Sequence, residues 1–221
     1  MFQFCLFDLD GTLTDPREGI TKSVQYALAK QGIEEPDITK LEFFIGPPLR
    51  DSFMKAYDMT REKAEESVAF YRERFAPIGV LENKMYEGIP ELLKALSEKG
   101  VKNAIASSKP TVFIHQILEH FGIKQYFDVI VGSELDGRRD TKEEVVEEAL
   151  RQLGIMEMDE AKKKTFCAMI GDRKFDIQGA KAHGLTGIGV GFGFAEEGEL
   201  EAEGADYVVE TVEELQKLLL A

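Results

Sequence analysis

The sequence predicts an α/β protein with a parallel sheet and an inserted all-helical domain. Three observations support this prediction. Short apolar runs rich in β-branched and aromatic residues alternate with amphipathic helical runs over most of the 221 residues. Glycine and proline punctuate the helical runs at their ends. From about residue 16 to residue 83, helical periodicity continues with no convincing strand between the helices.

The strand candidates are short and mostly apolar, which is typical of strands that are covered on both faces. They are residues 2–8, 101–107, 127–133, 165–172, 186–191 and 206–209. Because a helical run follows nearly every one of them, we expect right-handed crossovers, a parallel sheet and helices on both sides of it.

The helix candidates between these strands have recognisable ends. GIPELLKALSEKG has Pro90 near its start and Gly100 after its end. TVFIHQILEHFG has Thr111 as its expected N-cap and Gly122 as its stop, and TKEEVVEEALRQLG repeats the pattern.

The insert follows directly after the first strand. EGITKSVQYALAKQG, PPLRDSFMKAYD and TREKAEESVAFYRERF each have helical periodicity. We therefore expect an α/β core made of residues 1–15 and 84–221, and a helical domain made of residues 16–83. From its position, the insert can cover whatever the loop after the first strand binds.

Composition excludes several classes of partner. A net charge of −14 and an isoelectric point near 4.8 argue against a nucleic acid polymer or an anionic membrane, because the field would repel phosphate groups. No stretch approaches the roughly 18 apolar residues that span a bilayer. A small anion needs only a local positive pocket.

Location and oligomeric state are expected from simpler features. The sequence starts with strand-like residues rather than a basic segment followed by an apolar one, so we expect a cytoplasmic protein. Cys5 and Cys167 lie in apolar runs, which favours packing in a reducing compartment. No helix offers a spare apolar face, which favours a monomer.

Polar residues gather where the predicted strands end. Asp8 and Asp10 follow the first strand, and Gly11 allows the backbone to turn sharply. Ser107 ends the second strand, and Lys142 begins the helix after the third. Asp172 ends the fourth strand, with Asp176 one helical turn further on. Because ligands of open parallel sheets bind beyond the carboxyl ends of the strands, we expect these side chains to meet.

The chemistry of this set is that of phosphoryl transfer. Asp8 and Asp172 suit Mg²⁺, which prefers oxygen ligands. Lys142 would neutralise phosphate charge, and Ser107 would donate a hydrogen bond to a phosphoryl oxygen. Asp8 is then the expected nucleophile on phosphorus, and Asp10 the acid that protonates the leaving group and later the base for water. Asp10-Gly11 alone is also an ordinary turn signal.

These residues carry a family resemblance. FDLDGTLTD resembles the first motif, DxDGTLxD, of the haloacid dehalogenase superfamily, and IASSKP, the lysine of DTKEEV and IGDRKFD resemble its later motifs in order. The resemblance implies a Rossmann-like core, Asp8 as nucleophile, Asp10 as acid and base, and Asp172 as metal ligand. It also implies that Asp10 ligates the metal through its backbone carbonyl, and that Asp176 holds Lys142 or a metal-bound water.

Residue type alone leaves alternative roles for the expected phosphate and substrate ligands. The resemblance implies Ser107 and Lys142 as phosphate ligands; Ser108 is included beside Ser107, with helix capping as a competing role. The insert is similar to the family's helical cap, and FFIGPPLRDSF resembles the cap segment that reaches over the substrate. Arg50 of that segment is the expected contact for the distal part of the substrate, with a solvated helical side chain as the alternative.

The resemblance implies a Mg²⁺-dependent phosphatase that acts on a small metabolite through an aspartyl phosphate. Phosphoglycolate and nucleoside 5′-monophosphates are the expected substrate types, because the branch with such caps includes phosphoglycolate phosphatases and bacterial 5′-nucleotidases. A phosphosugar mutase of the β-phosphoglucomutase type is the alternative, although DPREGITKSVQY lacks the histidine that mutases carry after the first motif. A dehalogenase would not need Asp10, and a non-catalytic binder would not need this set of charges.

Overall fold

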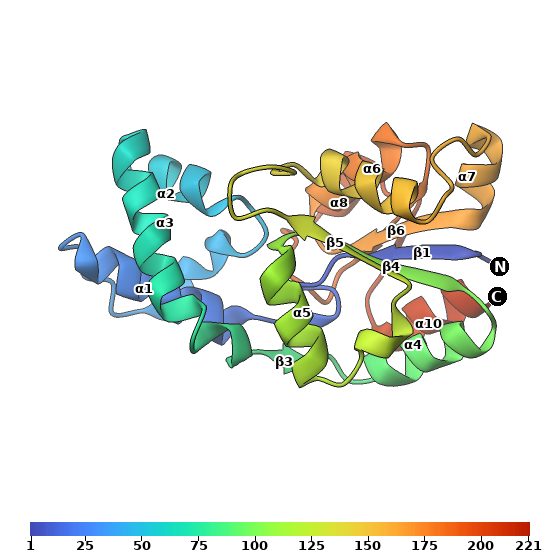
Figure 1. The fold of residues 1–221 in the computed structure, drawn as a ribbon, viewed down its shortest axis with the longest axis horizontal. Helices are drawn as coiled ribbons and strands as arrows, with labels where there is room; N and C mark the ends of the chain where they lie inside the picture. The colour runs from blue at the N-terminus through green and yellow to red at the C-terminus, as the bar shows by residue number, and fades with distance from the viewer. The chain divides into compact units, whose positions relative to one another are not determined.

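The computed structural model describes residues 1–221 and divides the chain into two units (Figure 1). One unit contains residues 1–14 and 85–221, and the other contains residues 15–84. The short strands β2 (Thr14–Asp15) and β3 (Lys84–Met85) pair where the chain passes from one unit to the other. The two units are described separately below.

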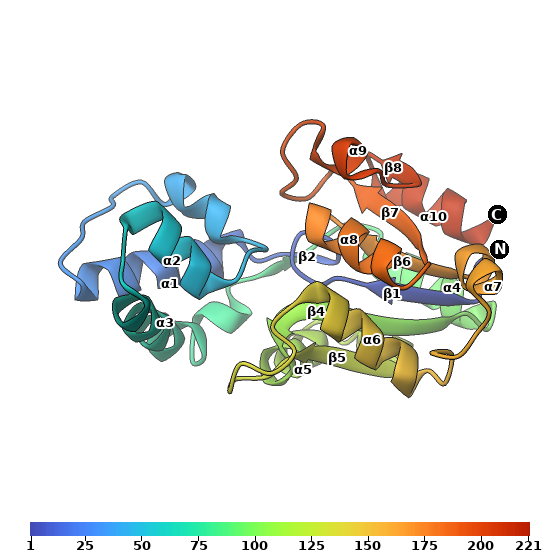
Figure 2. The ribbon, with the colours of Figure 1, turned by 90° about the horizontal axis from the view of Figure 1, so that it is seen from above.

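The larger unit is built on a six-stranded parallel sheet with the order β5-β4-β1-β6-β7-β8. Its strands are β1 (Phe4–Phe7), β4 (Lys102–Pro110), β5 (Val129–Ser133), β6 (Cys167–Gly171), β7 (Thr186–Val190) and β8 (Tyr207–Val209). Figure 2 shows β1 between β4 and β6. In the register, Leu6 lies beside Ala104 on one side and Met169 on the other. The parallel α/β prediction is therefore confirmed.

Helices cover both faces of the sheet (Figure 1). One face carries α4 (Ile89–Glu98), α5 (Thr111–His120) and α10 (Val212–Leu220), and the other carries α6 (Lys142–Gln152), α7 (Glu160–Phe166) and α8 (Lys174–Ala182). The short helices η3 (Lys124–Tyr126) and α9 (Glu199–Glu203) lie in connections. Leu6, Val131, Val146 and Met169 are fully or almost fully buried between the sheet and its helices. Burial on both faces explains why the strands are continuous apolar runs.

Most helix ends lie where the punctuation predicts them. Pro90 occupies the first turn of α4, and Gly100 and Gly122 follow α4 and α5 with φ of +77° and +65°. A capping box between Thr141 and Glu144 starts α6, so that Lys142 is its first residue. This cap fixes the backbone from which the Lys142 side chain extends.

Two local expectations were wrong. Thr111 does not cap α5: it is the first residue of the helix, and its hydroxyl donates to the carbonyl of Ser133 on β5 at 3.3 Å. The same oxygen accepts a hydrogen bond from the Gly132 N–H of β5 at 3.2 Å, which uses the acceptor that a cap would need. The strand expected at 165–172 begins only at Cys167, because the two preceding residues end α7.

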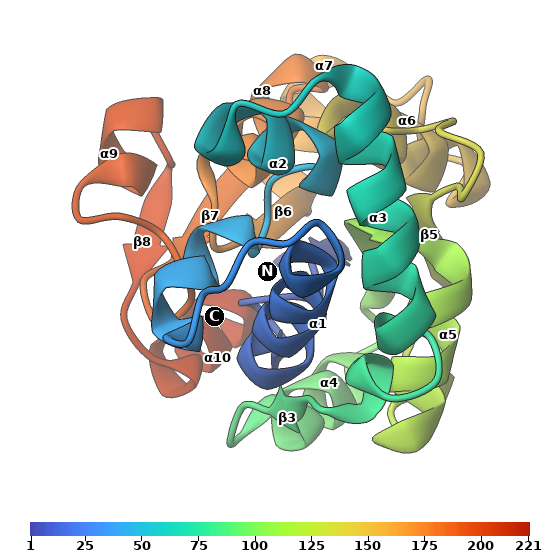
Figure 3. The same ribbon diagram turned by 90° about the vertical axis from the view of Figure 1, so that its left-hand side faces the viewer.

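The smaller unit consists of helices between its two terminal strand residues. They are α1 (Arg17–Lys30), η1 (Ile38–Phe44), α2 (Leu49–Tyr57), α3 (Arg61–Phe75) and η2 (Gly79–Leu81). Figure 3 shows α1, α2 and α3 packed together. The rings of Phe44 and Phe53 lie 4.7 Å apart in its core. A Cβ at Gly19 would lie 2.0 Å from the carbonyl oxygen of Gly79, so glycine is required where α1 meets η2. The all-helical prediction is confirmed, and none of these helices or those of the larger unit has the length and apolarity of a membrane span.

Candidate active site

The loop after β1 turns tightly at the carboxyl end of the sheet. The Asp8 N–H still donates to Ile170 of β6 at 2.9 Å, and Gly11, with φ of +79°, donates to the Thr14 carbonyl at 2.7 Å. A Cβ at Gly11 would lie 2.0 Å from a carboxylate oxygen of Asp172. Glycine at this position therefore allows the β1 loop to lie directly against the end of β6.

A second tight turn places the other carboxylates. Asp172 follows Gly171, the last residue of β6, and Asp176 lies in the first turn of α8 with its Oδ2 accepting from the Arg173 N–H at 3.0 Å. A Cβ at Gly171 would lie 2.0 Å from the Asp176 carboxyl carbon. The glycine thus makes room for the Asp176 side chain to fold back over the strand end.

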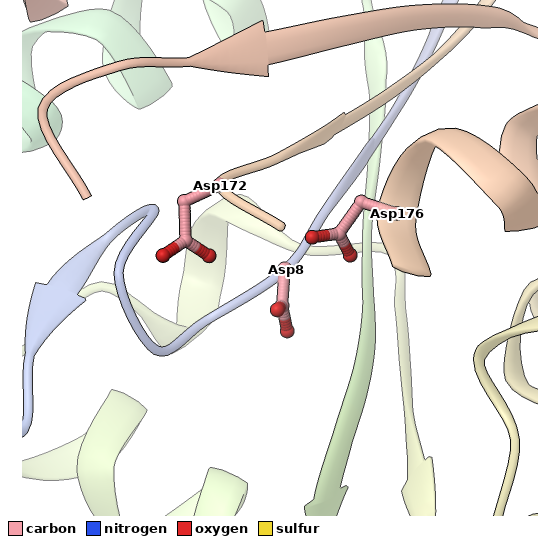
Figure 4. Close-up of side chains that lie close together, drawn as sticks. All are labelled: Asp8, Asp172 and Asp176. Carbon is pink, nitrogen blue, oxygen red and sulfur yellow. The ribbon is translucent and has the colours of Figure 1, made fainter. Parts of the chain in front are cut away.

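Asp8, Asp172 and Asp176 come together at this edge (Figure 4). One carboxylate oxygen from each lies within 4.8 Å of the others. The three residues are 7%, 1% and 0% exposed. Carboxylates at this spacing repel one another and lose hydration on burial, so the cluster needs positive charge.

Lys142 supplies part of that charge. Its Nζ lies 3.1 Å from Oδ1 of Asp8 and 2.8 Å from Oδ1 of Asp176, and it donates to the Ala106 carbonyl at 3.0 Å. Burial by itself would lower the pKa of Lys142, but the Asp176 and Asp8 carboxylates outweigh burial and raise the pKa above its ordinary value. Lys142 is therefore a permanent cation between two carboxylates.

Lys142 does not remove the cost of burying the carboxylates of Asp172 and Asp176. Burial first, and then the neighbouring Asp176 and Asp8 charges, raise the pKa of Asp172 well above its ordinary value, and the Phe194 N–H at 2.8 Å from Oδ2 only partly opposes this. Burial also raises the pKa of Asp176 to about 6, although Lys142 opposes the shift. One lysine thus does not balance the cluster.

Asp10 has its own cation, which the sequence reasoning did not assign a role. Lys109 Nζ lies 2.6 Å from Oδ2 of Asp10, and the two side chains are 5% and 13% exposed. Burial raises the pKa of Asp10, and Lys109 works against that shift. The available signal was the position of Lys109 in IASSKP, at the carboxyl end of the strand beside β1.

The loop after β7 is a second contribution that was missed. The Phe194 N–H donates to Asp172, and a Cβ at Gly193 would lie 2.3 Å from the Asp172 Cβ. The sequence GFGF after a strand was the signal for a backbone that approaches the site closely. Arg173, which follows Asp172 in the sequence, forms an ion pair with Glu199 at 3.0 Å. Its guanidinium is therefore directed to Glu199.

The remaining expected residues lie in different surroundings. Ser107 is buried at the end of β4, and its Oγ accepts from the Lys109 N–H at 3.3 Å. Ser108 is half-buried, and its carbonyl accepts from the Ser133 hydroxyl at 2.8 Å. Arg50 lies on α2 of the helical unit, 3.5 Å from Asp51, so its contact with substrate stays a prediction.

The donor set fits a divalent cation. Oδ1 of Asp172 is buried with no hydrogen-bond partner, and the residue lies beside two other carboxylates. Hard cations bind carboxylate oxygens, and an ion here would offset both the burial and the repulsion that raise the pKa of Asp172. The candidate ligand atoms are carboxylate oxygens of Asp8, Asp172 and Asp176, and Lys142 contacts Asp8 and Asp176 but not Asp172 among these three.

The fold and this site define a hydrolase that holds acidic side chains, two lysines and a cation site at the carboxyl ends of a parallel sheet. The family model of haloacid dehalogenase-like hydrolases matches residues 5–190. The chain therefore belongs to the haloacid dehalogenase-like hydrolases, and it is a phosphatase of that family.

Known relatives are similar along nearly the whole chain. A 5′-nucleotidase of Pseudomonas aeruginosa is 51% identical over 197 residues, which cover 89% of this chain and 86% of that protein. The tyrosine-protein kinase PtkA of Mycobacterium tuberculosis is 36% identical over 98% of this chain and 72% of its own length. The crystal structure of a predicted phosphatase from Clostridium acetobutylicum has a TM-score of 0.93, 47% identity, and coverage of 100% of this chain and 99% of that one.

Replacing Asp172 by asparagine is expected to raise the melting temperature of the protein when a chelator is present. The folded-state pKa of Asp172 lies above its ordinary value of 3.8, so ionisation destabilises the fold as the pH rises from 3.8 through the folded-state pKa. The gain in Asp172→Asn should therefore grow over that range and disappear below it. Thermal unfolding in EDTA across the pH range measures this.

Asp206→Asn is the control of opposite sign. Partial burial by itself would raise the pKa of Asp206. The Lys164 ammonium and the Gly187 N–H, at 2.6 and 2.8 Å, outweigh burial and lower this pKa. Its ionised form stabilises the fold above the ordinary value of 3.8 and less so as the pH falls. Asp206→Asn should thus lower the melting temperature at neutral pH. A loss of stability in Asp172→Asn as well would show that the Asp172 charge is already compensated.

Proposed function

We propose that this protein is a Mg²⁺-dependent phosphatase that hydrolyses a small phosphomonoester, of the nucleoside 5′-monophosphate or phosphoglycolate type, through an aspartyl phosphate. The observation that carries the proposal is the contact of Asp8 with Lys142 at 3.1 Å inside the cluster of acidic side chains. A nucleophilic carboxylate, a permanent cation and a cation site in one buried place are the components that phosphoryl transfer requires.

Asp8 is the proposed nucleophile. Its Oδ1 accepts from the Leu9 N–H at 2.7 Å and faces Lys142, and these two contacts fix the orientation of the carboxylate. An oxygen of Asp8 forms the new bond to phosphorus while the bond from phosphorus to the ester oxygen breaks. Lys142 and the hydroxyls of Ser107 and Ser108 are proposed to bind the phosphoryl oxygens, where they stabilise negative charge.

Asp10 is the proposed acid and base. Burial raises the pKa of this carboxyl, which favours the protonated form needed at the start. Its proton goes to the departing alkoxide, so that the alcohol leaves neutral. Asp10 then takes a proton from the water that attacks phosphorus, the bond to Asp8 breaks, and inorganic phosphate and the original carboxylates are restored.

A bound Mg²⁺ would neutralise charge on the phosphoryl group and on the acidic cluster. Asp8, Asp172 and the backbone carbonyl of Asp10 are the proposed ligands. Asp176 is proposed to act behind them by holding Lys142, which it contacts at 2.8 Å. This division agrees with the burial of Asp176, which has no exposed surface from which to reach a substrate.

The helical unit is proposed to select the substrate, and sequence similarity supports one substrate type. The 51% identity to a 5′-nucleotidase supports a nucleoside 5′-monophosphate over phosphoglycolate. Arg50, on α2, is proposed to contact the part of the substrate distant from the reacting phosphate. A cytoplasmic location and a monomeric state, both expected from the sequence, stay predictions.

Asp8→Asn should lose the turnover of p-nitrophenyl phosphate by at least about 10³-fold, because the amide cannot form the phosphorylated intermediate. Release of p-nitrophenol with Mg²⁺ present measures this, with circular dichroism to show that the variant is folded. Asp136→Asn, which changes an exposed aspartate in the loop after β5, is the matched control and should keep wild-type activity. Equal rates for wild type and Asp8→Asn would remove Asp8 from the mechanism.

A substrate panel then separates the alternatives. Inorganic phosphate release is followed with nucleoside 5′-monophosphates, phosphoglycolate and a hexose 1-phosphate, and the products of the last are analysed for hexose 6-phosphate. We expect the highest kcat/KM with a nucleoside 5′-monophosphate. Preference for phosphoglycolate would change the substrate class, and hexose 6-phosphate without phosphate release would establish a mutase instead.

A further inference from the structure

We propose that Lys109 is a positioning residue that holds the Asp10 carboxyl in the orientation needed to protonate the leaving group. The inference rests on the proposed function, in which Asp10 is the acid, and it adds a residue to which the sequence reasoning assigned no role. Three features of the structure carry it: the geometry of the ion pair, the clamped backbone of Lys109, and the separate use of the two buried lysines.

The ion pair is one-sided. Lys109 Nζ contacts Oδ2 of Asp10 at 2.6 Å, whereas Oδ1 of the same carboxyl is buried and has no hydrogen-bond partner. A carboxyl held by one oxygen has that oxygen restrained, and its other oxygen remains available to exchange a proton. This is the arrangement that an acid and base needs, because the reacting oxygen must not be occupied by the group that orients it.

The backbone of Lys109 is held on several sides. Its N–H donates to Ser107 Oγ at 3.3 Å, and the Ser133 hydroxyl donates to the carbonyl of Ser108 at 2.8 Å. A Cβ at Gly132 would lie 2.3 Å from the Lys109 carbonyl oxygen, so β5 approaches Lys109 as closely as only glycine permits. The register between β4 and β5 shifts at this point, between Ala106 and Pro110. The lysine thus extends from a rigid irregularity at the strand end rather than from a mobile loop.

The two buried lysines have separate partners. Lys142 contacts Asp8 and Asp176, and Lys109 contacts Asp10. The proposed nucleophile and the proposed acid thus contact different lysines, Lys142 at the start of α6 and Lys109 near the end of β4. Lys109 also links the acid to Ser107, a proposed phosphate ligand, through its own backbone.

The alternative role for Lys109 is charge neutralisation alone, which would support folding but not leaving-group departure. The two roles differ in their dependence on the leaving group. The nitrophenolate anion departs readily without a proton, whereas phenolate is a poorer leaving group and depends more on the acid. Phenyl phosphate and p-nitrophenyl phosphate have nearly the same shape, so the ratio of their kcat/KM values isolates protonation of the leaving group. The parameter kcat/KM reports the steps up to loss of that group, which precede hydrolysis of the intermediate.

In Lys109→Met, the ratio of kcat/KM for p-nitrophenyl phosphate to that for phenyl phosphate should rise by about 10-fold, a fraction of the 10²–10⁴ typical of general acid catalysis. Lys102→Met, which breaks the exposed ion pair of Lys102 with Asp128 at the other end of β4, is the matched control and should leave the ratio unchanged. An unchanged ratio in Lys109→Met, whether both rates fall or neither does, overturns the inference. If Lys109→Met does not fold, Lys109→Arg keeps the charge but moves the contact, and the same ratio decides.

Asp10→Asn distinguishes failure of this inference from failure of the proposed function. The variant should raise the same ratio by at least as much as Lys109→Met. If Asp10→Asn leaves the ratio unchanged, Asp10 is not the acid, and both the assigned role of Asp10 and the inference about Lys109 fall. If Asp10→Asn raises the ratio and Lys109→Met does not, the proposed function stands and Lys109 only neutralises charge.

Discussion

The charge balance of one buried cluster is the constraint that the architecture of this site has to satisfy. Four carboxylates, those of Asp8, Asp10, Asp172 and Asp176, meet two lysines at the carboxyl ends of the sheet. If all six groups are ionised, two negative charges remain uncompensated. Removed from water, such an excess is costly, and the raised pKa of Asp172 is its direct expression. The proposed divalent cation would carry the opposite charge, and it would allow the phosphate of a substrate to join the site. The excess negative charge that is costly in the protein without ligands therefore favours binding of the cation that the proposed chemistry needs.

The fold brings these charges together by backbone features that the side chains alone would not provide. The central position of β1 between β4 and β6 places the Asp8 loop beside the ends of both neighbours. Glycines then allow the close approaches: Gly11 lies against Asp172, Gly171 against Asp176, and Gly132 against Lys109. A side chain at any of the three would occupy space that a charged group or its backbone now fills. The site is thus built from strand ends whose spacing is set by the sheet and whose final approach depends on glycine.

Much of the core could be predicted from the sequence, because its determinants are local. Apolar runs gave the strands, and the rule that parallel strand ends converge brought Asp8, Lys142, Asp172 and Asp176 to one edge, where the structure also has them. The roles given to these residues stay predictions. The ion pair of Lys109 with Asp10 was missed because it depends on a register shift in β4 and on the direction of a long side chain. The Thr111 cap was wrong because its hydroxyl oxygen accepts a hydrogen bond from Gly132 of β5 instead of from its own helix. Arg50 lies on a separate unit, so neither local pattern nor the geometry of the core can assign its contact.

The central claim is that the acidic cluster is completed by a divalent cation, and calorimetric titration of the chelator-stripped protein with MgCl₂ tests it most directly. We predict one ion bound per wild-type chain, and affinity at least about 10-fold weaker in Asp172→Asn, because loss of a metal ligand should weaken binding at least as much as loss of a residue that supports one. Equal affinity in the two proteins, or no binding by the wild-type protein, would contradict it.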